Sequence, residues 1–165
     1  MLNELDSGHA DHPVDIVERL AAHNQWSFER SGDDEIAIEV TGTWCSYNTS
    51  FTWVEEMESL HLACAFGLKV PEARRIEMLK LIAMINEQLW IGHFDLWPSE
   101  DVVMFRHSLL LAGCSDALPR QCEAILDIAL RTAERYYQAF QFVVWAGKRA
   151  EEALAGTLFE TVGRA

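Results

Sequence analysis

Three residues near the middle of the chain are of the types that acid–base and ligand chemistry uses: His93, Asp95 and His107. His93 and Asp95 stand two residues apart in a segment that alternates like a strand, so both side chains project to the same side. A histidine beside a carboxylate can transfer a proton or hold a small ligand. His107 falls on the same side of an expected strand as the apolar Phe105 and Leu109. This position is also typical of a hydrogen-bonded histidine near a core. A solvent-facing polar strand edge explains the first two better, so the three residues are ligand candidates only under an alternative function.

The familiar signatures of enzymes and metalloproteins are absent from the sequence. There is no P-loop or GxGxxG run, and GxSxG, HExxH and paired CxxC motifs are missing too. His9 and His12 lie in a polar N-terminal lead-in, where histidines are ordinarily solvated. His61 and Cys64 stand three apart on an expected strand, so they point to opposite faces and cannot share an ion. We therefore predict no catalytic residue, no cofactor and no metal, and a protein that is not an enzyme.

Two other features could bind a partner: one tryptophan and a set of acidic residues. The chain has six tryptophans, a type enriched in binding hot spots, and Trp97 beside an expected turn is the best candidate for exposure. The acidic residues fall in two turns that could share one end of a meander: Asp33, Asp34, Glu35, Glu55, Glu56 and Glu58. They could dock a basic segment, although such loops are also commonly just solvated, and tryptophan also fills cores.

The charge of the chain limits its partners. The net charge is −13, and residues 1–60 hold thirteen acidic residues against two arginines. Such a surface repels phosphate backbones, so we predict no nucleic-acid binding. The N-terminus is acidic where a signal peptide is basic, and no apolar run approaches the length of a membrane span. We expect a soluble cytoplasmic protein, with no membrane partner, whose cysteines stay reduced: Cys45, Cys64, Cys114 and Cys122.

Hydrophobic periodicity predicts the elements of the first half of the chain. Pro13 opens a helix that runs to about Asn24, and the alternation of Trp26 and Phe28 with polar residues indicates a short strand. Residues 35–41, 47–53 and 59–66 alternate as strands with short connections, which favours antiparallel pairing.

The second half contains two helices and a hairpin. Residues 72–90 read as a helix with Gly92 at its C-terminal cap, and residues 94–111 as two strands around a turn. Pro119 starts a helix that keeps its apolar spacing for about 27 residues. We predict one α+β domain over residues 1–165, with an antiparallel five-stranded sheet in the order α-β-β-β-α-β-β-α. Its core spans about 13–145, and a helical extension and tail, interrupted at Gly147 and Gly156 and loosely held from residue 157, fills 146–165.

The segment from the second helix into the hairpin carries a recognisable combination: Asn86, Gly92, Phe94, Val103, Phe105, Arg106 and Leu109. With this order of elements, residues 13–145 resemble the YbjN family of bacterial proteins, labelled sensory transduction regulators. The resemblance implies the fold of type III secretion chaperones, which are small, acidic, cytosolic and usually homodimeric proteins that bind segments of other proteins.

Together, the residues and the resemblance predict a non-enzymatic cytosolic regulator or chaperone-like protein. It would bind a protein or peptide partner as a homodimer. The alternative is a small-molecule-binding protein or enzyme whose pocket lies between the sheet and the long C-terminal helix and uses His93, Asp95 or His107.

Overall fold

The computed structural model describes residues 11–113 and 118–162, and the side chains as far as residue 157. Over these residues the elements are α1 (Pro13–His23), β1 (Ser27–Arg30), β2 (Glu35–Thr41), β3 (Ser46–Val54), η1 (Glu55–Met57), β4 (Ser59–Lys69), η2 (Glu72–Arg74), α2 (Arg75–Asn86), β5 (His93–Trp97), β6 (Val102–Leu110), α3 (Leu118–Val144) and α4 (Ala150–Val162). His9 and Cys114 lie outside the described residues.

The strands form one antiparallel sheet in the order β1-β2-β3-β4-β6-β5. The predicted α+β class and antiparallel meander are confirmed, but the sheet has six strands in the described residues and not five. The additional strand is the short segment with Phe28, which pairs along β2 from Ile36 to Glu39. The alternation of Trp26 and Phe28 indicated this strand, but its place in the sheet depends on pairing with β2, which the sequence does not show.

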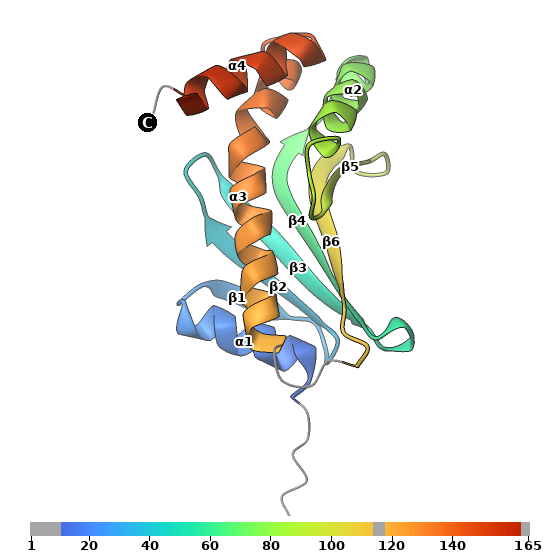
Figure 1. Cartoon of the computed structure of the whole chain (residues 1–165), viewed down its shortest axis with the longest axis vertical. Helices are drawn as coiled ribbons and strands as arrows, with labels where there is room; N and C mark the ends of the chain where they lie inside the picture. The colour runs from blue at the N-terminus through green and yellow to red at the C-terminus, as the bar shows by residue number, and fades with distance from the viewer. Residues whose placement is uncertain (1–10, 114–117, 163–165) are drawn as a thin grey trace, which may run out of the picture.

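One face of the sheet carries the core. Ile36 and Ile38 of β2, Phe51 of β3, and Leu62 of β4 point to this face and are buried, as the period of two predicts. Figure 1 shows α1 and α3 crossing this face, with α3 running diagonally along its length. No helix of the described part of the chain covers the opposite face.

Aromatic rings fill the space between α3 and the far strands. Phe140 of α3 stacks on Phe66 of β4 with ring centroids 5.6 Å apart and meets Phe94 of β5 edge to face at 5.0 Å. Phe94 in turn packs against Phe105 of β6 at 5.6 Å. Ring contacts therefore anchor the C-terminal half of α3 to β4 and β5 directly, and to β6 through Phe94.

Helix α2 is shorter than the predicted 72–90. Its first turn is a 3-10 turn, and it ends at Asn86, whose side chain accepts from the N–H of Phe94 (2.8 Å) and donates to the carbonyl of Phe94 (3.0 Å). These two bonds tie the helix end to β5. Gly92 has a positive φ of 70°, and a Cβ there would lie 2.1 Å from the Phe105 ring, so this position serves close packing and not the helix cap.

The C-terminal region is more regular than the sequence suggested. The chain turns at Gly147 (φ 63°) as expected, but Gly156 lies inside α4, and the predicted loose tail from residue 157 is helical as far as Val162. Arg74 donates to the carbonyls of Val143 (2.8 Å) and Lys148 (2.6 Å). Hydrogen bonds to these carbonyls at the end of α3 fix the turn into α4.

Candidate functional site

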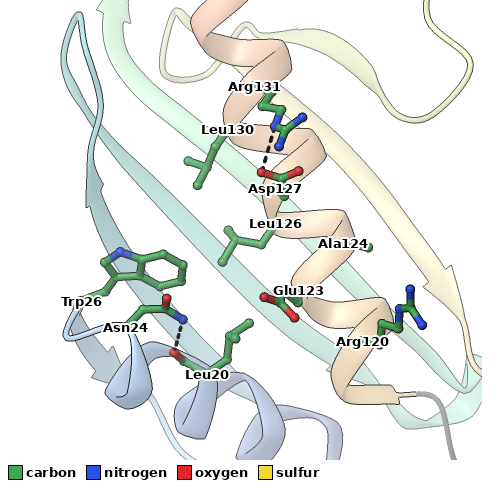
Figure 2. Close-up of a pocket in the computed structure, with 10 residues that line it drawn as sticks. All are labelled: Leu20, Asn24, Trp26, Arg120, Glu123, Ala124, Leu126, Asp127, Leu130 and Arg131. Atoms are coloured by element: carbon green, nitrogen blue, oxygen red, sulfur yellow. Dashed lines mark hydrogen bonds and ion pairs between the residues drawn. The ribbon is translucent and has the colours of Figure 1, made fainter.

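A groove lies between α3 and the elements at the β1 edge of the sheet. Its central part is a cavity of about 450 Å³ lined by Leu20, Asn24, Trp26, Arg120, Glu123, Ala124, Leu126, Asp127, Leu130 and Arg131. Figure 2 shows Leu20 and Trp26 approaching from α1 and the chain before β1, while Leu126 and Leu130 approach from α3. The apolar side chains of distant parts of the sequence therefore converge on one space.

The groove continues beyond this cavity in both directions. A second cavity of about 500 Å³ shares Leu20, Arg120 and Glu123 and extends the groove past Pro119. A third of about 390 Å³ shares Leu130 and ends at Glu134. From Pro119 to Glu134 the helix rises about 22 Å, at 1.5 Å per residue. The site is thus elongated along α3.

The sequence of α3 explains why an apolar floor exists there. The buried stripe of the helix contains Cys122, Ile125, Leu126 and Ala129. The half-buried Leu130, four residues after Leu126, widens this apolar arc toward α1. The facing elements are short, and Leu20 and Trp26 are both only half-buried. The side chains on the two sides of the groove therefore do not fill it.

Charges at the groove are of both signs. Arg131 donates from Nε to Oδ1 of Asp127 at 3.0 Å, an exposed pair one helical turn apart. Arg120 and Glu123 are also exposed beside the groove. Because exposed pairs contribute little free energy, the apolar floor would dominate the affinity for a ligand.

The far end of the groove is closed by polar contacts under the β2–β3 turn. Oε1 of Glu134 accepts the backbone N–H of Thr43 at 2.9 Å. Burial raises the pKa of the Tyr47 hydroxyl, and the neighbouring Glu134 carboxylate raises it further. Burial also raises the pKa of the Cys45 thiol. The Tyr47 hydroxyl and the Cys45 thiol therefore keep their protons at neutral pH and serve as packing groups at this end of the groove.

The structure brings His93 and Asp95 together with two groups that the sequence analysis did not connect to them. Nε2 of His93 lies 3.5 Å from Oδ2 of Asp95, and Nη1 of Arg106 donates to the same oxygen at 2.9 Å. His61 accepts from Nε of Arg106 at 3.2 Å. The residues His61, His93, Arg106, His107 and Ser108 line a cavity of about 280 Å³.

This cavity does not lie between the sheet and α3, where the alternative function placed it. Phe94 packs its ring against Tyr136 and Phe140 of α3. His93 and Asp95 flank Phe94 on the strand, so their side chains project to the opposite face of the sheet. The alternation of β6 points His107 to the core face of the sheet. Its side chain is only half-buried, because the edge strand β5 begins at His93, opposite Arg106, and does not extend beside His107.

The six acidic candidates do share one end of the sheet. Asp34 accepts through its carbonyl from the N–H of Trp53 at 2.7 Å, which places the β1–β2 turn beside the end of β3 and η1. All six side chains are exposed: Asp33, Asp34, Glu35, Glu55, Glu56 and Glu58. Asp34 is also 3.1 Å from Nε2 of His12, just before α1. The acidic loops therefore border the end of the sheet where α1 begins.

Trp97 is not the exposed tryptophan that the turn suggested. It is half-buried, and the guanidinium of Arg106 lies 5.7 Å from its ring centroid. Trp90 is fully exposed instead, just after α2. On α2 itself, Ile76, Leu79 and Ala83 form an exposed apolar stripe, opposite the buried side of the helix. The spacing of three and four residues could have indicated this second stripe, but the sequence analysis assigned only the buried apolar side of the helix.

Residues 11–113 and 118–162 contain neither a candidate metal site nor a candidate membrane span. No group of three or more histidine, cysteine or acidic side chains there could hold a metal ion. In the same part of the chain, no helix combines the length and apolar composition needed to cross a bilayer. Cys45, Cys64 and Cys122 are free thiols.

The chain matches one protein family and is similar to solved structures. The family model of YbjN, described as "Putative bacterial sensory transduction regulator", matches residues 13–142. The chain belongs to the YbjN family. No curated protein sequence matches it significantly. A chain of the ExsC–ExsE complex aligns with a TM-score of 0.50 and 15% identity, over 74% of this chain and 88% of that chain. YbjN from E. coli aligns with a TM-score of 0.48 and 10% identity, over 75% and 93%.

The YbjN match confirms the family that the sequence indicated, and the ExsC–ExsE alignment agrees with the expected chaperone-like fold. The residues that carry the family resemblance serve mainly as scaffold: Asn86 binds the backbone of Phe94, and Gly92 packs on Phe105. The groove also lies within the YbjN match, whereas α4 lies beyond it.

Proposed function

We propose that this YbjN-family protein is a non-enzymatic, chaperone-like regulator of the bacterial cytoplasm that binds a polypeptide segment in the groove along α3. The observation that carries the proposal is the shape and lining of the groove. It follows the helix for about 22 Å, with Leu20, Trp26, Leu126 and Leu130 along its central part. An extended segment of about six or seven residues spans such a length.

A polypeptide fits this site better than a small molecule does. Small-molecule sites are concave and bury most of the ligand surface. Here the walls are a helix on one side and a short helix with a four-residue strand on the other. A segment with apolar side chains at regular spacing could place them along this floor in succession.

The family and one structural neighbour support a protein ligand. The family description concerns sensory transduction regulators, and the neighbour ExsC–ExsE is a complex of two proteins. The acidic loops with Asp33, Asp34, Glu35, Glu55, Glu56 and Glu58 and the net charge of −13 favour a partner with basic residues next to its apolar ones.

The apolar stripe on α2 supports the homodimer that the family resemblance implies. Ile76 is 71% exposed and Leu79 49% exposed, and neither contributes to the core. Lys80 lies beside the middle of the stripe, where it pairs with Glu77 of the same helix at 3.2 Å. Two antiparallel copies of α2 would bury the stripe of each helix against that of the other.

Photo-crosslinking inside a bacterial cell tests the polypeptide site. A photoreactive phenylalanine analogue replaces Leu130 in the groove or, as a control, the exposed Leu110 on the open face of the sheet. We expect discrete polypeptide adducts at position 130 that disappear when Leu20→Glu is added, and none at position 110. Equal adducts at both positions, or none at position 130 in a folded variant, would contradict the proposal.

Sedimentation velocity tests the dimer separately. We expect the wild-type protein to sediment as a dimer and Leu79→Glu as a folded monomer, while Leu110→Glu stays dimeric. A monomeric wild type, or a Leu79→Glu variant that remains a dimer, would remove α2 as the dimer interface.

A further inference from the structure

The cavity on the open face of the sheet has an unusual set of side chains for an acidic protein. Its lining contains one arginine, three histidines and a serine: His61, His93, Arg106, His107 and Ser108. None of these five is acidic, although the chain carries 26 acidic residues. Arginine, histidine and serine all donate hydrogen bonds, and arginine in particular matches the geometry of phosphate oxygens.

We propose that this cavity binds a small tetrahedral oxyanion, either free phosphate or the phosphate group of a small monoester. The cavity measures about 280 Å³, slightly below the range of about 300–1,000 Å³ that is usual for drug-sized ligands. It accommodates a phosphate with a short substituent and not a whole nucleotide. The site lies on the face of the sheet opposite the groove, so it is independent of polypeptide binding.

Arg106 is held in place before any ligand arrives. Its Nε donates to His61 (3.2 Å), its Nη1 donates to Asp95 (2.9 Å), and its guanidinium lies over the Trp97 ring. These contacts occupy two of the five N–H groups of the guanidinium. Because the side chain is already positioned, a ligand would bind without paying the entropy of ordering it.

Asp95 opposes the ligand in a way that can be measured. Its carboxylate is the counter-charge of Arg106 in the structure, and it also lies 3.5 Å from His93. An incoming oxyanion must share Arg106 with this carboxylate and is repelled by it. Neutralising Asp95 should therefore strengthen anion binding, whereas neutralising a remote carboxylate should not.

His61 couples the site to pH. Burial lowers the pKa of His61, with Arg106 and His93 lowering it further. The charged or titratable groups that face it are Arg106 on β6 and His93 and Asp95 on β5. A bound oxyanion would raise the pKa of His61, so binding takes up a proton and the affinity rises as the pH falls.

Isothermal titration calorimetry of the full chain with inorganic phosphate, methyl phosphate and sulfate tests the site at constant ionic strength. Sulfate keeps its charge between about pH 6 and about pH 8, so its pH dependence reports the protein alone. We expect sulfate to bind up to about tenfold more tightly at about pH 6 than at about pH 7, which is the effect of one linked proton over one pH unit. Comparable binding of methyl phosphate would identify monoesters as ligands, and binding of inorganic phosphate alone would identify free phosphate.

Four variants complete the test. Asp95→Asn should bind the anions several-fold more tightly than wild type, while Glu151→Gln, the same charge change on the exposed side of α4, should leave the affinity unchanged. Arg106→Lys should weaken binding, and His61→Gln should reduce the pH dependence. No binding by the folded wild type, or equal gains in Asp95→Asn and Glu151→Gln, would overturn the proposal.

Discussion

The two halves of α3 follow the same apolar periodicity but end in different surroundings. The C-terminal half presents Tyr136, Tyr137 and Phe140, which are buried against aromatic rings of the sheet. The N-terminal half presents Leu126, which is buried at the floor of a groove, and Leu130, which is only half-buried beside it. The side chains on the facing elements make the difference, because large rings fill the space at one end and a half-buried leucine and tryptophan leave it open at the other.

The core of the molecule ends where the groove along α3 begins. The sheet order puts β4, β5 and β6 beneath the aromatic half and the short β1 at the groove edge. A four-residue strand cannot supply the side chains that would close the groove. The same helix thus serves stability at one end and is available for a ligand at the other.

Phe140→Ala should produce the largest effect, because it removes a fully buried ring at the centre of the aromatic half. We expect a loss of about 3–5 kcal/mol in the free energy of unfolding, measured by urea denaturation. A loss below about 1 kcal/mol would mean that the aromatic half is not the better-packed region.

Gly42→Ala should destabilise the closed end of the groove. An added Cβ would lie 2.1 Å from Oε1 of Glu134 and 2.3 Å from the Tyr47 ring. We expect a loss of about 1–3 kcal/mol and faster hydrogen exchange at the Thr43 amide, whose bond to Glu134 must give way. Unchanged stability and exchange would show that this end is as loosely packed as the rest of the groove.

Thiol labelling compares the opening of the two regions directly. Burial raises the pKa of Cys64 and of Cys122 to about 11, so both thiols are unreactive until the structure opens locally. Cys122 lies near the start of α3, whereas Cys64 lies in the central strand β4. We expect Cys122 to label at least about tenfold faster in native buffer, equal to ~1.4 kcal/mol, as measured by peptide mass spectrometry. Equal rates would contradict the difference between the regions.

Leu130→Ala should have the smallest effect, because this side chain is only half-buried beside the groove. We expect a loss below about 1 kcal/mol, measured in the same denaturation assay. The matched variant Leu126→Ala, at a side chain 1% exposed, should cost about 2–3 kcal/mol. A large loss in Leu130→Ala would place this residue in the core and not in the groove.

The sequence predicts local features of this fold well, since they depend on residues near one another. The alternation of Ile36, Ile38 and Val40 predicts the inner face of β2, and the spacing along α3 predicts its 27 residues. The end of α2 at Asn86 could not be predicted, because it depends on bonds to Phe94 across a turn.

The sites were less predictable than the helices and strands, because they bring together residues that are far apart in the sequence. His93 and Asp95 share a side by strand parity alone, but His61 and Arg106 join them only through the pairing of β4, β6 and β5. The groove residues Leu20 and Leu130 are more than a hundred positions apart. Their meeting is a property of the tertiary structure, although Leu126 and Leu130 beside the buried stripe were a signal in the sequence.

The central claim, that the groove along α3 receives a polypeptide, is tested most directly by nuclear magnetic resonance. The ¹⁵N-labelled protein is titrated with a peptide from the partner captured at position 130, and the indole N–H signals of Trp26 and Trp97 are followed. Trp26 lines the groove, whereas Trp97 lies on the opposite face of the sheet. We predict that Trp26 and the amides of residues 118–131 shift while Trp97 does not. Shifts at Trp97 with an unchanged Trp26 would contradict the account.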